Sequence, residues 1–119
     1  MSHSKKIICL SLAVAALVVS SCRSPDIYDW GNYEQLIYAS YTKPDKATPE
    51  LQAQVMEEDM NDAASDNKPL PPGFHAHLGY LYYQMGKLDL AAGEFKKEKE
   101  QFPESAVFMD RLIANLNRK

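Results

Sequence analysis

The sequence has little cysteine, little glycine and no excess of positive charge. Its two cysteines, Cys9 and Cys22, are too few for a disulfide-stabilised scaffold. Its five glycines form no glycine-rich phosphate-binding loop. Because acidic residues outnumber basic ones and the net charge is −3, the phosphates of a nucleic acid would repel the chain. A length of 119 residues allows one small domain at most.

The N-terminal segment, MSHSKKIICLSLAVAALVVSSC, has the organisation of a secretory signal. Lys5 and Lys6 precede an uncharged apolar run over residues 7–19, and small residues follow that run. A helix that spans a membrane needs about 20 apolar residues, so this run is too short. We therefore predict that residues 1–21 are a signal peptide that is removed.

The end of this segment, Val19-Ser20-Ser21-Cys22, resembles the lipobox of bacterial lipoproteins. The resemblance implies cleavage before Cys22 and attachment of acyl chains such as palmitate to that residue. Several acyl chains together give stable membrane anchoring where one does not. An ordinary signal peptide that happens to contain a cysteine is the alternative. Apart from the covalent lipid on Cys22, we expect no cofactor.

Residues 22–29 are predicted to form a lipidated tether, because they contain Pro25 and show no helical period. Lipoproteins that stay at the inner membrane of Gram-negative bacteria typically carry Asp after the lipidated cysteine. This chain has Arg23 there, so the resemblance implies anchoring at the periplasmic face of the outer membrane. Cys9 leaves with the signal, so the processed chain has no disulfide.

The rest of the chain, residues 30–119, predicts a single all-α domain. Apolar residues spaced by three and four indicate a helix from Trp30 to Tyr41. A second helix is expected over residues 48–67, with Thr48 as its N-cap and Pro49 in its first turn. Its apolar stripe is predicted to be Leu51, Val55, Met56, Met60 and Ala63 or Ala64, with Glu57, Glu58 and Asp59 on a solvated face.

Residues 72–105 closely resemble a tetratricopeptide repeat, a helical hairpin of 34 residues. The positions that carry the resemblance are Leu78, Gly79, Tyr82, Gly86, Ala91, Phe95 and Pro103. Gly79 and Ala91 are small where the two helices approach, and Phe95 fills the gap between them. Two positions depart from the pattern: His75 replaces the usual tryptophan and Glu98 the usual alanine. Both departures are expected to weaken the packing.

A lone repeat cannot bury its apolar faces, so other elements must cover it. Residues 105–117 predict a capping helix with Ser105 as its cap and apolar residues at three-and-four spacing, namely Phe108, Met109, Leu112, Ile113 and Leu116. The first two helices would form a degenerate repeat. The fold is therefore predicted to be a short tetratricopeptide-like array of about five helices in antiparallel pairs.

The triplet His75-Ala76-His77 is not predicted to bind a metal. On a helix, His75 and His77 lie about 160° apart, whereas two helical histidines share a metal at a spacing of four. No other ligand cluster, no nucleophile paired with a base and no catalytic carboxylate pair is evident. The sequence therefore does not predict an enzyme.

The first repeat helix has a second face, which includes His77, Tyr80, Tyr83 and Gln84. In the repeat family this face lines the groove that takes a peptide or a partner helix, and tyrosine is enriched at such contacts. We predict these four residues as partner-binding. The alternative is that Tyr80 and Tyr83 pack under the first two helices as core residues.

The lipobox and three further segments are similar to a family of small, uncharacterised outer-membrane lipoproteins of Gram-negative bacteria: YDWGNYEQL, KPLPPGFHAHLGYLYYQMG and FPESAVFMDRLI. Genes of that family commonly lie beside one for a lipoprotein similar to the curli secretion channel. The resemblance implies an adaptor or assembly factor that binds other envelope lipoproteins, such as that channel-like protein. The alternatives are a pilotin-like escort of another envelope protein, or an envelope hydrolase.

Overall fold

The computed structural model describes residues 26–116 and 118, and it confirms an all-α fold of five α-helices with no strand in that part of the chain. Residues 1–25, which include the predicted signal peptide and Cys22, lie outside the described residues. The elements are α2 (Tyr33–Thr42), α3 (Pro49–Ser65), α4 (Phe74–Gln84), α5 (Leu88–Gln101), the 3₁₀ turn η1 (Pro103–Ser105) and α6 (Ala106–Leu116).

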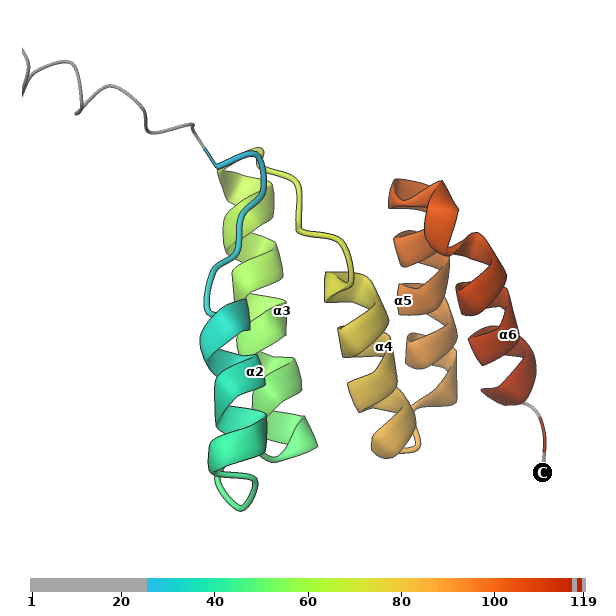
Figure 1. The fold of residues 1–119 in the computed structure, drawn as a ribbon, viewed down its shortest axis with the longest axis horizontal. Coiled ribbons are helices and arrows are strands. Elements are labelled where there is room, and N and C mark those ends of the chain that lie inside the picture. Colours follow the sequence, from blue (N-terminus) through green and yellow to red (C-terminus); the bar gives the residue numbers. More distant parts are fainter. Residues whose placement is uncertain (1–25, 117, 119) are drawn as a thin grey trace, which may run out of the picture.

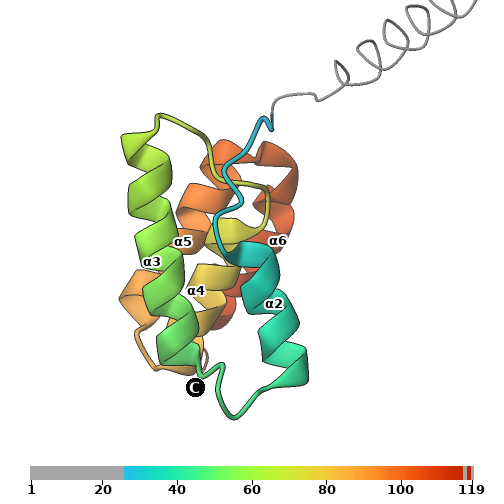
Figure 2. The same ribbon diagram turned by 90° about the vertical axis from the view of Figure 1, so that its left-hand side faces the viewer.

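The helices stand side by side, and each runs antiparallel to its neighbour along the chain (Figure 1). The pair α2 and α3 lies at one end of the row, with α4, α5 and α6 following in order. Seen along the row, α3 and α5 lie toward one side and α2 and α6 toward the other (Figure 2). Helix α5 makes the most extensive packing contacts, with α4 before it and α6 after it.

Local signals explain where the first two helices begin. The Thr48 hydroxyl accepts a hydrogen bond from the amide of Leu51 at 3.3 Å, and Pro49 is the first residue of α3, as predicted. Helix α2 starts later than expected, at Tyr33 rather than Trp30. The reason is Gly31, whose φ of +45° lies in the left-handed region and cannot continue a helix toward Trp30.

The core lies between α3, α4, α5 and α6. Its buried apolar residues are Ala53, Met56, Ala63, Leu70, Phe74, Leu78, Leu81, Tyr82, Ala91, Phe95 and Met109. The predicted stripe of α3 was wrong at one end, because Leu51 is exposed while Gln52 and Asp59 are buried. The reason is that the buried face of α3 is rotated by about one residue relative to the apolar stripe.

The close approach of α4 and α5 depends on Gly79. A Cβ atom at this position would lie 2.7 Å from Cε1 of Phe95 and 3.1 Å from the carbonyl oxygen of Ala91. Phe95 and Ala91 are both buried. The predicted packing of these three positions is therefore confirmed.

Replacing Gly79 with Ala is expected to lower the free energy of unfolding by about 1–3 kcal/mol, because the new methyl group overpacks against Phe95. Gly93 is the matched control, since a Cβ there meets no described atom within 4 Å. Gly93→Ala is expected to stabilise α5 by about 0.5–1 kcal/mol through helix propensity. Urea unfolding followed by helical circular dichroism measures both, and effects of equal sign would contradict this packing.

Two buried carboxylates hold the starts of two other helices. Asp59 of α3 accepts hydrogen bonds at 2.8 Å from both the amide and the side-chain Nδ2 of Asn32, the N-cap residue of α2. Glu98 of α5 accepts from the amides of Gly73 at 2.7 Å and Ala76 at 3.2 Å, at the start of α4. A negative charge at a helix N-terminus also interacts favourably with the helix dipole. In both helical hairpins, α2–α3 and α4–α5, a carboxylate of the second helix thus bonds the start of the first helix.

These contacts correct two predictions. Asp59 was expected on a solvated face, but it is buried because it reaches across the first hairpin to α2. Glu98 was expected to weaken the packing in place of alanine, but it supplies two hydrogen-bond acceptors to the start of α4. The neighbouring Glu57 is also bonded, since its Oε1 accepts a hydrogen bond from the Tyr82 hydroxyl at 2.5 Å.

The second departure from the repeat pattern, His75, is compensated in a similar way. His75 is buried, and its Nδ1 lies 2.6 Å from Oε2 of Glu94, which is also buried. The other oxygen of Glu94 accepts from Lys97 at 2.7 Å. Burial raises the pKa of Glu94, but the hydrogen bonds and the charges of His75 and Lys97 together lower it by more, so the pKa lies below its ordinary value and the carboxyl group is ionised at neutral pH.

The C-terminal helix differs from its prediction at two positions. Ser105 lies in η1, and its hydroxyl donates to the carbonyl oxygen of Phe102 at 2.8 Å instead of capping α6. Phe108 is exposed, whereas Met109 is buried and Leu112, Ile113 and Leu116 pack against the core. The helix thus turns one side of its broad apolar stripe to solvent.

The described end of the predicted tether already lies against the helices. The amide of Asp29 donates to the carbonyl oxygen of Pro69 at 2.8 Å. The ring of Tyr28 packs edge-on against Phe102, with the centroids 6.1 Å apart. From Tyr28 onward the chain is therefore part of the folded domain.

Candidate surface for a partner on α4

The four predicted partner-binding residues lie along α4, on the side that turns away from the core. Tyr80 and Tyr83 are 51% and 50% exposed, so they do not pack under the first two helices. Their rings stack with centroids 6.4 Å apart and an interplanar angle of 28°. Gln84 is exposed and His77 is half-buried. Two hollows flank this row of side chains.

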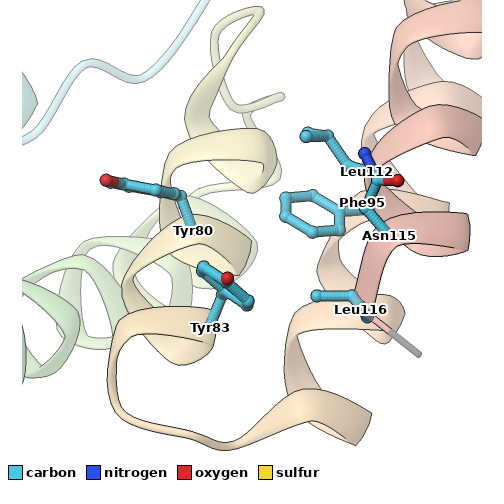
Figure 3. Close-up of a pocket in the computed structure, with 6 residues that line it drawn as sticks. All are labelled: Tyr80, Tyr83, Phe95, Leu112, Asn115 and Leu116. Atoms are coloured by element: carbon cyan, nitrogen blue, oxygen red, sulfur yellow. The ribbon is translucent and has the colours of Figure 1, made fainter. Parts of the chain in front are cut away.

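The first hollow, which we call the α4–α6 hollow, encloses about 210 Å³. Tyr80 and Tyr83 stand on one side of it, residues of α6 stand opposite, and Phe95 of α5 lies between them (Figure 3). The residues from α6 are Leu112, Asn115 and Leu116. The hollow is therefore lined almost wholly by apolar and aromatic groups.

The second hollow, the α2–α4 hollow, encloses about 460 Å³ on the other side of α4. Tyr80 lines this hollow too, and its ring extends away from α6 (Figure 3). The remaining lining residues come from α2, the connection to α3, α3 and α4: Ile37, Ser40, Tyr41, Ala47, Pro49, Gln52, His77, Leu81 and Gln84. We call the surface formed by the two hollows the tyrosine face.

The tyrosine face carries no formal charge. Among the described residues that line the two hollows, none is Asp, Glu, Lys or Arg, although such residues make up 24% of the sequence. Its one titratable group with a pKa near neutrality is His77, and burial lowers the pKa of that imidazole below its ordinary value. His77 is therefore neutral at pH 7, and the face offers neutral groups only.

Two side chains that line the α2–α4 hollow, Gln52 and His77, each carry an unpaired polar atom. Gln52 of α3 is only 5% exposed, and its Nε2 donates to the carbonyl oxygen of Ala47 at 2.7 Å. Neither Oε1 of Gln52 nor Nδ1 of His77, both buried, has a hydrogen-bond partner within residues 26–116 and 118. Leaving a buried polar atom unpaired costs about 1–3 kcal/mol. Both side chains line the α2–α4 hollow, so this hollow has buried hydrogen-bonding capacity that the described residues leave unused.

The two histidines of the His-Ala-His triplet lie on different sides of α4, as the helical geometry predicts. His75 contacts Glu94 of α5, whereas the ring of His77 lies 5.6 Å from that of Tyr33 in α2. Within the described ranges, no group of three or more His, Cys, Asp or Glu side chains is arranged to hold a metal ion. No helix among the described residues is long and apolar enough to span a membrane.

Sequence reasoning found four residues of the tyrosine face on α4, but it missed Leu81 on that helix and the residues on the neighbouring helices. The apolar residues spaced by three and four that predicted the first helix include Ile37 and Tyr41, and those that predicted the last helix include Leu112 and Leu116. That spacing did not say which of these residues face α4. Gln52 was missed, since a polar residue beside an apolar stripe resembles a solvated position. Its position next to Ala53 and Met56, one turn after the Thr48 cap, is the only available signal.

Within residues 26–116, the fold and this face define a small all-α domain built from two antiparallel helical hairpins and a closing helix. The chain belongs to the family described as Domain of unknown function (DUF4810), whose model matches residues 27–112. The match covers α2 to α5 and more than half of α6. Comparisons with curated proteins and with solved structures give no match.

Proposed function

We propose that this protein is a lipoprotein of the outer membrane whose domain binds other envelope proteins as an adaptor or assembly factor on the periplasmic side. The observation that carries the proposal is the uncharged tyrosine face, with Tyr80 and Tyr83 half-exposed beside two hollows. The anchor is supported by the lipobox that ends at Cys22 and by Arg23 after it. The proposed role is recognition rather than catalysis.

The tetratricopeptide-like character of the domain is part of the proposal. The contact of Gly79 with Phe95 supports it, because that contact is what the repeat pattern demands. The carboxylate contacts of Asp59 and Glu98 support an array of two similar hairpins, because the second helix of each hairpin bonds the start of the first, although Glu98 itself departs from the tetratricopeptide pattern. In an array of such hairpins, alternate helices line one side, and here α2, α4 and α6 line the tyrosine face.

Exposed aromatic surface of this kind favours protein binding. Tyrosine combines a large apolar area with a hydroxyl group that can hydrogen-bond, and it is enriched at protein interfaces. Contiguous apolar patches on a small domain mark interaction sites more often than isolated apolar residues do. A partner that covers Tyr80 and Tyr83 would bury both rings and fill the hollows beside them.

The binding proposal is tested by placing a photoreactive phenylalanine analogue at Tyr83 and irradiating intact cells. We expect a discrete crosslinked species from Tyr83 and none from Tyr38, a matched control that is 70% exposed and lines neither hollow. A stable complex of fixed stoichiometry would support an adaptor, and transient contact with one client would support an escort. Equal crosslinking from both positions would contradict a specific face.

The anchor is tested separately by Cys22→Ser. Without the thiol no acyl chain can be attached, so we expect the variant to leave the membrane fraction and appear in the periplasmic extract. Fractionation followed by immunoblotting measures the shift, with Cys9→Ser as the matched control, which should remain in the membrane. A Cys22→Ser protein that still sediments with the outer membrane would refute lipid anchoring.

A further inference from the structure

We infer that the tyrosine face takes an uncharged peptide segment, which places an amide group in the α2–α4 hollow and an apolar side chain in the α4–α6 hollow. This inference rests on the proposed function and names the chemistry of the partner. Tyr80 lines both hollows, so they are neighbours on one face and a single segment can occupy both.

The charge of the segment follows from the lining. An ionised side chain that enters either hollow loses water and finds no Asp, Glu, Lys or Arg among the described lining residues to compensate. The lining residues themselves therefore offer no charge that would attract a charged peptide, and the guanidinium of Arg118, which donates to Oδ1 of Asn115 at 3.5 Å, is a charged group in contact with one of them. A neutral segment loses nothing of this kind, so charge complementarity favours it over an acidic or a basic one.

The amide follows from the two unpaired atoms. With Nε2 of Gln52 already bonded to Ala47, Oε1 of Gln52 can only accept a hydrogen bond. The neutral ring of His77 presents Nδ1 as a donor in one tautomer and as an acceptor in the other. Both atoms have almost no accessible surface, so a ligand reaches them once the two side chains turn toward the hollow that they line. An amide then has an N–H for Gln52 and, through its oxygen or a second N–H, a group for His77. Asn, Gln and the peptide main chain all supply that chemistry.

The apolar anchor follows from the other hollow. Its lining of Tyr80, Tyr83, Phe95, Leu112 and Leu116 offers hydrocarbon, with Asn115 as the one amide group. A volume of about 210 Å³ gives room for one large apolar side chain. Burial of such a side chain between the tyrosines and α6 supplies affinity, and the amide in the second hollow fixes its orientation.

The inference is tested by selecting binders from a phage-displayed library of random short peptides on the full chain. The Tyr80→Ala/Tyr83→Ala double variant serves as the counter-target. We expect the enriched peptides to be depleted in charged residues and to carry Leu, Ile or Phe within a few residues of Asn or Gln. The best peptide, synthesised and titrated by calorimetry, should bind the double variant at least about tenfold more weakly. Its affinity should change less than about twofold between low and high salt.

A matched pair of glutamines tests the amide contact. Gln52→Met should weaken binding of that peptide about fivefold through the loss of one hydrogen bond, whereas the exposed Gln54→Met should leave it unchanged. Circular dichroism establishes that both variants are folded. Replacing Asn by Leu in the peptide, or methylating its main-chain nitrogens, separates a side-chain amide from a main-chain one.

The outcomes separate this inference from the proposed function. Selected peptides that are charged and salt-dependent, yet still lost in the double variant, would overturn the inference and leave a binding face in place. Equal effects of Gln52→Met and Gln54→Met would overturn the amide contact. A library that yields no peptide above the double variant would refute both.

Discussion

Phe95→Ala is expected to lower the free energy of unfolding by about 3–5 kcal/mol, more than any other single truncation discussed for this domain. Phe95 is 2% exposed, and its ring lies against Gly79 where α4 and α5 meet. It also forms the floor of the α4–α6 hollow. The cavity left by the missing ring would be continuous with that hollow. Neighbouring side chains cannot easily fill the enlarged space. Urea denaturation followed by helical circular dichroism measures the change.

Phe108 provides the matched control for this substitution. It is 60% exposed on α6, so Phe108→Ala removes the same atoms from a site where water already reaches them. We expect a change within about 0.5 kcal/mol. A loss at Phe95 below about 1 kcal/mol, or a comparable loss at Phe108, would mean that α5 and α6 pack differently.

Glu98→Ala is expected to destabilise the domain by about 2–4 kcal/mol, because the amides of Gly73 and Ala76 lose their acceptor at a part-buried helix start. The experiment distinguishes two interpretations of this position. By the repeat pattern, alanine is the usual residue, and its introduction should improve the packing. By the hydrogen bonds, the carboxylate is required. The sign of the change in unfolding free energy therefore decides between them.

Glu100→Ala serves as the control, since Glu100 is exposed on the same helix two residues further on. Its removal should change stability by no more than about 0.5 kcal/mol. A Glu98→Ala variant as stable as the parent would show that the start of α4 finds other partners. An increase in stability would favour the repeat pattern over the cap.

Sequence periodicity was sufficient for the helices because it is a local signal. The spacing of Leu78, Tyr82, Ala91 and Phe95 placed the second hairpin, and its packing followed from residue size at Gly79. The caps could not be found in the same way. Asn32 and Asp59 are 27 residues apart, and Gly73 and Glu98 are 25 apart, so no short motif joins them.

The candidate site also has a part that local sequence signals predicted and a part that they did not. One helix carries His77, Tyr80, Tyr83 and Gln84. Because successive residues of a helix are rotated by about 100°, the sequence alone predicted that these four side chains lie on the side away from the core. The opposite walls, from Ile37 in α2 to Leu112 in α6, depend on how separate helices stack. The stacking of the helices depends on how all the core side chains pack together, so no single segment of the sequence predicts it.

The carboxylates of Asp59 and Glu98, which bond the starts of α2 and α4 from a later helix, have a consequence for the order in which the domain can fold. Helices α2 and α4 have 10 and 11 residues, which is too short to be stable alone, and neither N-cap residue bonds its own helix through a side chain. A chain that emerges N-terminus first leaves the start of α2 open to water until Asp59 has followed. The amides at the start of α4 likewise have no carboxylate acceptor until Glu98 has emerged. A fragment truncated before Glu98 still contains both Asn32 and Asp59 but lacks the acceptor for the amides of Gly73 and Ala76, so the start of α4 and the surface around Tyr80 should be the less ordered part.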